Sequence, residues 1–221
     1  MQVKICGITN LEDALTAVAA GADYLGFIFY PPSKRAVSVA DAQGIAAHLR
    51  RLPDCPRLVG VFVDATAVEM AHVLDHVNLD LAQLSGDEVP SLVGDPASPL
   101  YGRAYKALRP TSFAEAEADA EWFMAPEGVR PSLLIDSYHP TLRGGSGLTG
   151  DWALSARLAR QVSGLMLAGG LTPENVAAAV RQIRPFAVDV ASGVEAAPGR
   201  QDPARVAAFI RNAKKASANH G

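Results

Sequence analysis

The chain has 221 residues, 49% of them hydrophobic, so it can bury a substantial core in one domain or two. Its formal net charge of -3 gives no reason to expect nucleic acid or anionic lipid as a partner. No apolar run approaches the ~20 residues of a membrane span, and the N-terminus lacks the pattern of a secretory signal, so we expect a cytoplasmic protein with no membrane partner.

Short apolar runs alternate along the chain with alanine-rich helical patterns. Helices are expected after the capping residues Asn10 and Ser38. Thr172-Pro173 and Asp202-Pro203 each place a capping side chain before a proline at the first helical position. Strands are predicted at residues 2–6, 24–28, 57–63, 79–84, 103–107, 132–136, 164–168 and 186–190.

Eight strand signals that alternate with helical ones predict a parallel sheet with right-handed crossovers. In a chain of this length, that count favours an α/β fold of one closed (β/α)₈ barrel, the TIM barrel, over an open doubly wound sheet. No linker rich in Pro, Gly and Ser divides the sequence. We therefore expect a single catalytic domain over residues 1–221.

The first strand ends in Cys6 and Gly7. A thiol at the tip of a strand, followed by a residue that lets the backbone bend, is placed for chemistry. The alternative is that Cys6 is a small buried hydrophobe, the commonest fate of a free cysteine. The other cysteine, Cys55, lies in a loop, and no Cys/His cluster has zinc spacing, so neither a disulfide framework nor a metal site is expected. Lys4 is expected to point away from Cys6 along the strand.

Several polar residues follow the predicted strands at the end where such barrels carry their active sites. Asp136 ends the sixth strand, Asp189 lies in the eighth, and the second strand runs into a loop with Arg35. A single carboxylate in such a place often caps a helix or binds a loop amide. Together with Cys6 on one rim, they predict an active site.

Glycine turns follow the last three strands: Gly144–Gly147, Gly169-Gly170 and Ser192-Gly193. Glycines let backbone N–H groups crowd round an anion, and in these barrels the loops after strands seven and eight commonly form a phosphate site. For Gly144–Gly147 a simple tight turn remains a respectable interpretation. The other two turns favour a phosphorylated small molecule as substrate.

Motifs spread in order over nearly the whole chain carry a family resemblance. They are Val3-Lys-Ile-Cys-Gly-Ile-Thr9, Gly21-Ala-Asp-Tyr-Leu-Gly-Phe27, Ser33-Lys-Arg35, Gly60-Val-Phe-Val63, Leu133-Leu-Ile-Asp136, Gly144-Gly-Ser-Gly147, Asp151-Trp152, Leu167-Ala-Gly-Gly-Leu-Thr-Pro-Glu-Asn-Val176 and Asp189-Val-Ala-Ser-Gly-Val-Glu195. With these motifs the chain resembles phosphoribosylanthranilate isomerase, a (β/α)₈ barrel of tryptophan biosynthesis. The resemblance implies an Amadori rearrangement of N-(5-phosphoribosyl)anthranilate to the carboxyphenylamino-deoxyribulose phosphate, with no metal or organic cofactor.

The resemblance also implies roles for individual residues. Cys6 becomes the general base and Asp136 the general acid. Arg35 matches an arginine that meets the anthranilate carboxylate, and Asp189 an aspartate that holds the ribose hydroxyls. The residues that match the phosphate cradle are Gly145, Gly169, Gly170, Ser192 and Gly193.

Three positions depart from the family pattern. In the family the fourth strand usually ends in Gln-Leu-His-Gly, and here Ser85 replaces the histidine. Ser146 replaces a threonine, and Gly150 replaces an aromatic residue. Any role of that histidine is therefore absent or moved, and the departures bear on the shape of the loop after strand six, whereas the proton-transfer pair is retained.

Two alternatives remain at this stage. The histidine-pathway aminoaldose isomerase, or a dual-substrate version of it, resembles this chain in its phosphate sites but carries aspartate where this chain has Cys6. A non-catalytic phosphosugar-binding barrel is the other alternative, and the joint presence of Cys6, Asp136, Arg35 and Asp189 argues against it. Either a monomer or a homodimer suits this fold.

Overall fold

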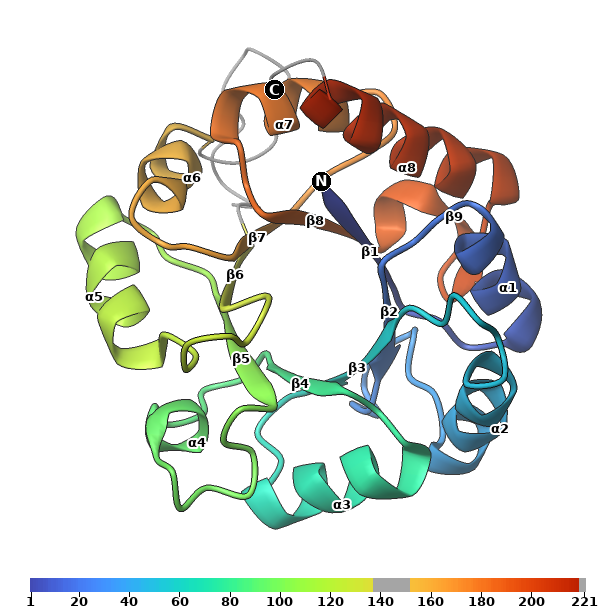
Figure 1. Cartoon of the computed structure of the whole chain (residues 1–221), viewed down its shortest axis with the longest axis horizontal. Helices are drawn as coiled ribbons and strands as arrows, with labels where there is room; N and C mark the ends of the chain where they lie inside the picture. Colours follow the sequence, from blue (N-terminus) through green and yellow to red (C-terminus); the bar gives the residue numbers. More distant parts are fainter. Residues whose placement is uncertain (137–151, 219–221) are drawn as a thin grey trace.

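The computed structural model describes residues 1–136 and 152–218. Its parallel strands close into a barrel with helices packed around the outside (Figure 1), so the predicted (β/α)₈ fold is confirmed. Closure is made by β1, which pairs with β2 through Lys4 and Tyr24 and with β8 through Lys4 and Asp189. The strands are β1 (Gln2–Cys6), β2 (Tyr24–Ile28), β3 (Arg57–Phe62), β4 (Leu81–Leu84), β5 (Ala104–Leu108), β6 (Leu133–Asp136), β7 (Leu165–Ala168) and β8 (Ala187–Val190).

Local capping explains where several of the helices begin. The Asn10 side chain accepts a hydrogen bond from the Asp13 amide at 2.9 Å, and Ser38 accepts one from the Asp41 amide at 3.1 Å, as their positions predicted. The helices are α1 (Leu11–Ala19), α2 (Val39–Leu49), α3 (Ala67–Val77), α4 (Ser91–Gly94), α5 (Phe113–Phe123), α6 (Trp152–Ala159), α7 (Val176–Ile183) and α8 (Pro203–Ala218). In the described part of the chain no helix is long and apolar enough to cross a membrane.

The two proline-led helix starts behave differently. At α8 the amides of Ala204 and Arg205 donate to Asp202 Oδ1, so Asp202-Pro203 begins the helix as predicted. After β7, Thr172-Pro173 instead forms a turn that precedes the helix, and α7 begins at Val176. The Asn175 side chain accounts for this delay, because it bonds the Thr172 amide and the Gly170 carbonyl and so holds the chain in a loop.

Three short elements after β8 were not predicted: the 3₁₀ turn η1 (Ser192–Val194) and the antiparallel strands β9 (Glu195–Ala197) and β10 (Arg200–Gln201). Of these, β9 and β10 form a small hairpin that lies between β8 and α8 in the chain. Strands of two or three residues carry too little periodicity to be read from a sequence.

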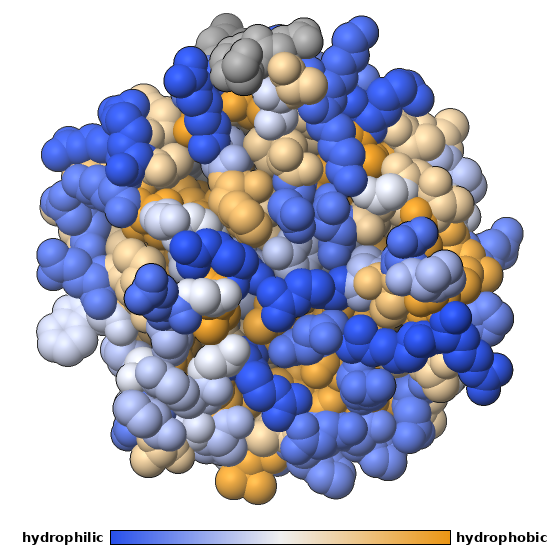
Figure 2. Space-filling view, in the orientation of Figure 1, coloured by the Kyte–Doolittle hydropathy of each residue, from blue (hydrophilic) through white to orange (hydrophobic). Residues whose placement is uncertain are grey.

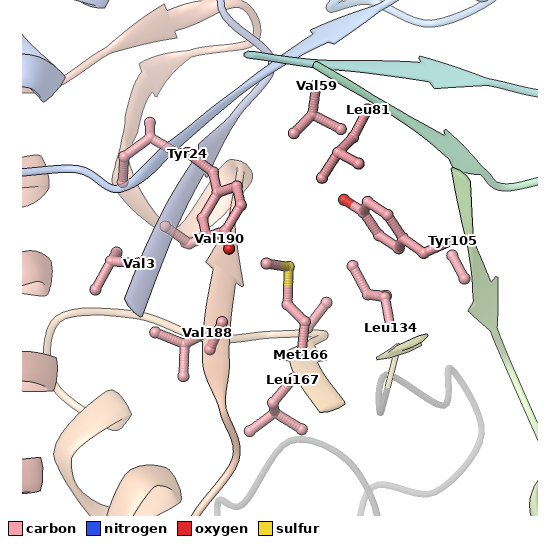
Figure 3. Packing of buried hydrophobic residues seen from close by; sticks show 14 of the residues in the cluster. Val3, Tyr24, Val59, Leu81, Tyr105, Leu134, Met166, Leu167, Val188 and Val190 are labelled. Atoms are coloured by element: carbon pink, nitrogen blue, oxygen red, sulfur yellow. The ribbon is translucent and has the colours of Figure 1, made fainter. Parts of the chain in front are cut away.

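Apolar side chains fill both the inside of the barrel and the layer between strands and helices. Tyr24, Tyr105 and Met166 extend from three different strands into the space that the barrel encloses (Figure 3), and each is at most 2% exposed. On the face drawn in Figure 2, hydrophilic and hydrophobic residues are interspersed. The barrel interior also contains buried polar side chains, among them Lys4, Gln83 and Asp189.

Candidate active site

A cavity of about 410 Å³ opens at the carboxyl ends of β6, β7 and β8. It is lined by Asp136, Asp189 and the turns Ala168–Leu171 and Val190–Gly193. Its size lies in the range of sites for small organic molecules. The structure therefore brings together six of the residues singled out in the sequence: Asp136, Gly169, Gly170, Asp189, Ser192 and Gly193.

The two glycine turns form one wall of this cavity, and both need glycine. Gly169 and Gly170 have positive φ angles of 96° and 62°, a backbone region that other residues rarely adopt. A Cβ on Gly193 would lie only 1.9 Å from the Leu171 carbonyl oxygen, because the loops after β7 and β8 touch there. This close approach exposes main chain to the cavity, which is the arrangement a bound phosphate requires.

Cys6 is buried at the end of β1, with 5% of its surface exposed. Across the sheet its register partner is Gly26, and a Cβ on Gly26 would lie 2.7 Å from Cys6 Sγ. The glycine in β2 thus leaves room for the sulfur atom. Burial raises the pKa of the Cys6 thiol, and the neighbouring Lys4 ammonium partly offsets that rise.

Lys4 lies inside the barrel, so the expectation that it points away from Cys6 is wrong. Successive side chains of a strand point to opposite faces, and residues two apart, such as Lys4 and Cys6, therefore share one face. Lys4 Nζ donates to Asp189 Oδ1 and to Gln83 Oε1, both at 3.0 Å. The Tyr105 hydroxyl donates to the same Gln83 oxygen at 2.9 Å.

The lysine in this interior cluster remains charged. Its side chain is fully buried, and burial by itself would lower its pKa. Attraction from Asp189 and Cys6 outweighs that penalty, so the pKa of Lys4 is raised above its ordinary value.

Arg35, in the loop after β2, lies over the Cys6-Gly7 turn. A Cβ on Gly7 would lie 2.9 Å from Arg35 Cδ, and Gly7 has a positive φ of 81°. The guanidinium makes a bidentate ion pair with Glu195 of β9, with Nε–Oε1 and Nη2–Oε2 distances of 2.7 and 2.6 Å. This pair raises the pKa of Arg35 and sets the orientation of its planar fork.

Glu195 and Arg109 contact predicted site residues but had not been assigned roles. Glu195 also accepts a hydrogen bond from the Gly199 amide, so the β9–β10 hairpin holds it against Arg35. Arg109, just after β5, places its Nε 3.7 Å from Asp136 Oδ2. Glu195 belongs to a motif noted in the sequence, whereas no sequence signal marked Arg109.

Some predicted residues lie outside the described ranges. Gly145, with the rest of Gly144–Gly147, and Gly150 are among them. Ser85 is described, and its Oγ accepts a hydrogen bond from Gln83 Nε2 at 3.2 Å. Ser85 thereby extends the polar cluster that begins at Lys4.

Comparison with known proteins identifies relatives over nearly the full length. Residues 3–212 match the family described as N-(5'phosphoribosyl)anthranilate (PRA) isomerase. The N-(5'-phosphoribosyl)anthranilate isomerase of Trichlorobacter lovleyi is 44% identical over 216 residues, covering 98% of this chain and 99% of the relative. That of Geobacter sulfurreducens is 44% identical over 214 residues, covering 97% and 98%.

Solved structures agree with this comparison. The crystal structure of phosphoribosyl anthranilate isomerase from Thermotoga maritima has a TM-score of 0.84 and 41% identity, and the match covers 97% of this chain and 99% of that one. A phosphoribosyl anthranilate isomerase in complex with reduced 1-(o-carboxyphenylamino)-1-deoxyribulose 5-phosphate has a TM-score of 0.81 and 40% identity, with the same coverage.

Proposed function

The chain belongs to the N-(5'-phosphoribosyl)anthranilate isomerase family, and from this premise we propose how its residues carry out the reaction. The chain isomerises N-(5'-phosphoribosyl)anthranilate in tryptophan biosynthesis, and its substrate is a small phosphoribosyl molecule. The product is 1-(2-carboxyphenylamino)-1-deoxyribulose 5-phosphate, formed by an Amadori rearrangement. The observation that carries the assignment of Asp136, Asp189 and the two glycine turns is the cavity that they line together, whereas Cys6 and Arg35 are not among its lining residues and are assigned from their places at the ends of β1 and β2.

Asp136 is proposed as the general acid. The first step opens the furanose ring and needs a proton on the ring oxygen, while the aniline nitrogen forms an iminium with C1. Asp136 lies at the end of β6, its side chain is 30% exposed, and it lines the cavity, so a bound sugar can reach it. A positioned acid of this kind contributes roughly 10²–10⁴-fold to the rate.

Cys6 is proposed as the general base. The second step removes the proton from C2, and the electrons of that C–H bond form the C1–C2 double bond of an enolamine, which then tautomerises to the ketone. The thiolate, and not the thiol, must take this proton. Burial raises the pKa of the Cys6 thiol and so opposes the thiolate, while the charge of Lys4 acts in the opposite direction and partly offsets that rise.

The remaining contacts are proposed to hold the substrate. Gly169, Gly170, Ser192 and Gly193 receive the phosphate in the cavity wall. Asp189 is proposed to hold the ribose hydroxyls through the carboxylate oxygen that does not accept from Lys4. Arg35 is proposed to bind the anthranilate carboxylate through Nη1, since Nε and Nη2 bind Glu195. Gly145 stays a proposed part of the phosphate cradle.

Growth rescue tests this proposal. The wild-type chain should restore growth of a tryptophan auxotroph that lacks this isomerase, whereas Cys6→Ser and Asp136→Asn should not. Assays on both aminoaldose substrates decide the alternatives: turnover of the histidine-pathway substrate would mean a dual-substrate enzyme. Binding of a phosphosugar without turnover of either substrate would mean a non-catalytic barrel.

Two further expectations concern the whole molecule. The relative from Thermotoga maritima is described as dimeric, and for this chain either a monomer or a homodimer is proposed. Sedimentation equilibrium decides between them. We also propose that residues 1–221 act as one domain in the cytoplasm, and a single cooperative unfolding transition would support one domain.

A further inference from the structure

The ammonium group of Lys4 has no exposed surface and lies among side chains from four strands. Two of its N–H donors bind Gln83 Oε1 and Asp189 Oδ1. Cys6 lies two positions further along β1 on the same face as Lys4, so the two side chains are neighbours, and the positive charge of Lys4 favours the thiolate form of Cys6.

The backbone of β2 makes this contact possible. A Cβ on Gly26 would lie 2.7 Å from Cys6 Sγ and 3.1 Å from Lys4 Cε, so both side chains occupy the space above this glycine. The aliphatic part of Lys4 and the Cys6 thiol therefore both occupy the space that the missing side chain of Gly26 leaves. Any larger residue at position 26 would separate them.

The groups that hold the lysine in place are neutral or acidic, so none of them supplies a positive charge. The Tyr105 hydroxyl bonds Gln83 Oε1, and Gln83 Nε2 bonds Ser85 Oγ, so the amide of Gln83 is fixed at both ends. Asp189 supplies the countercharge from β8. Together these contacts aim the ammonium group at the end of β1.

We propose that Lys4 is a positioning residue that stabilises the thiolate form of Cys6 through its positive charge. The inference deepens the proposed function, since it rests on Cys6 being the base. In the deprotonation step the thiolate takes the proton from C2, while Lys4 remains an ammonium group before and after. Lys4 touches neither the substrate nor the transferred proton.

The other charged or titratable groups around Cys6 also affect the equilibrium between its thiol and thiolate forms. Asp189 of β8 disfavours the thiolate, and the desolvation of the site has the same sign. Tyr105 of β5 is neutral near pH 7, because burial raises the pKa of its hydroxyl. Arg35, above the Cys6-Gly7 turn, is the second cation near the sulfur, but its charge is shared with Glu195. Lys4 is thus the cation that faces the thiol from within the barrel.

The test is a titration of the thiol itself, in a Cys55→Ser background so that Cys6 is the one remaining cysteine. The thiolate is followed by its ultraviolet absorbance against pH, with the Cys6→Ser protein subtracted to remove the tyrosine signal. In Lys4→Met the midpoint should move up by about one pH unit or more, which is about tenfold less thiolate at a given pH below it.

A matched control is Lys106→Met. Lys106 is a second buried lysine in an ion pair, with Glu88, and it contacts neither Cys6 nor its partners in the described residues. Its removal should leave the thiol midpoint where it is. A shift of equal size in both lysine variants, or none in Lys4→Met, would overturn the proposal.

In a third variant the thiol midpoint is expected to shift in the opposite direction, and a double variant covers the case in which Lys4→Met does not fold. Asp189→Asn removes the carboxylate that competes for Lys4, so the thiol midpoint should move down. If Lys4→Met does not fold, Lys4→Met/Asp189→Asn removes both charges of the pair and should still raise the midpoint relative to Asp189→Asn. A midpoint that stays the same between these two proteins contradicts the role of Lys4. The titration does not depend on turnover, so its failure differs from loss of activity in Cys6→Ser, which tests the proposed function.

Discussion

Two buried lysines in this barrel, Lys4 and Lys106, each form an ion pair with a carboxylate, but their other contacts differ. Lys106 of β5 donates to the carbonyl oxygens of Leu84 and Gly86 and to Glu88 Oε2, and Glu88 in turn accepts from the amides of Asp64 and Gly86. Together these contacts tie the backbone of Asp64 and Gly86, just after β3 and β4, to β5. Lys4 instead donates to the side chains of Gln83 and Asp189, and its charge acts on the neighbouring Cys6 thiol at the end of β1.

The difference shows that burial and an ion pair do not by themselves indicate function. Lys106 and Glu88 hold together the ends of β3, β4 and β5, which is a structural task. The charge of Lys4 acts on a group that can change its protonation. What separates the two lysines is the group beside each ion pair, which is loop backbone at Lys106 and a titratable thiol at Lys4.

The largest effect is expected from removal of the thiol. Cys6→Ser should lower kcat by roughly 10²–10⁴-fold with little change in KM, because it removes a base that acts only in the proton-transfer step. In that background Lys4→Met should have almost no additional effect on kcat. Steady-state kinetics of the two single variants and the double variant measure this coupling. If the losses in kcat of the two single variants multiplied in the double variant, Lys4 would act independently of Cys6.

The next effect concerns stability. Lys106→Met should destabilise the fold by about 3–5 kcal/mol, because it leaves Glu88 buried without its cation. The remaining folded protein should keep the kcat of the wild type. Urea unfolding followed by circular dichroism gives the free energy, and Lys106→Met/Glu88→Gln should recover part of it. A loss of kcat with unchanged stability would reverse the roles assigned to the two lysines.

The smallest effect is expected at the rim, where the charges are partly exposed. Arg35→Ala should raise KM by about 10- to 100-fold and change kcat little, since a charged hydrogen bond to a carboxylate is worth about 1.5–3 kcal/mol. Glu195→Gln should raise KM less, because Arg35 keeps its charge but loses the partner that orients its fork. Equal effects of the two variants on kcat and none on KM would argue against a substrate contact at Arg35.

Much of the fold followed from local patterns. The caps at Asn10, Ser38 and Asp202 act within one turn of helix, and the apolar runs of the strands are continuous in sequence, so both could be read without a structure. The strand ends then placed Asp136, Asp189 and the glycine turns on one rim, and the cavity confirms that the two carboxylates and the turns after β7 and β8 meet. The delayed start of α7 was missed because Asn175 binds backward to the Gly170 loop.

The sequence by itself determined the barrel and the rim residues, because strand alternation, capping and glycine turns depend on neighbours a few positions away. Only the tertiary structure decided what those residues touch. Lys4 meets Gln83 and Asp189 across 79 and 185 positions, and Arg35 meets Glu195 across 160. Such contacts exist only once the chain has folded, and for Lys4 closure of the barrel places the charge in a buried interior where it acts strongly.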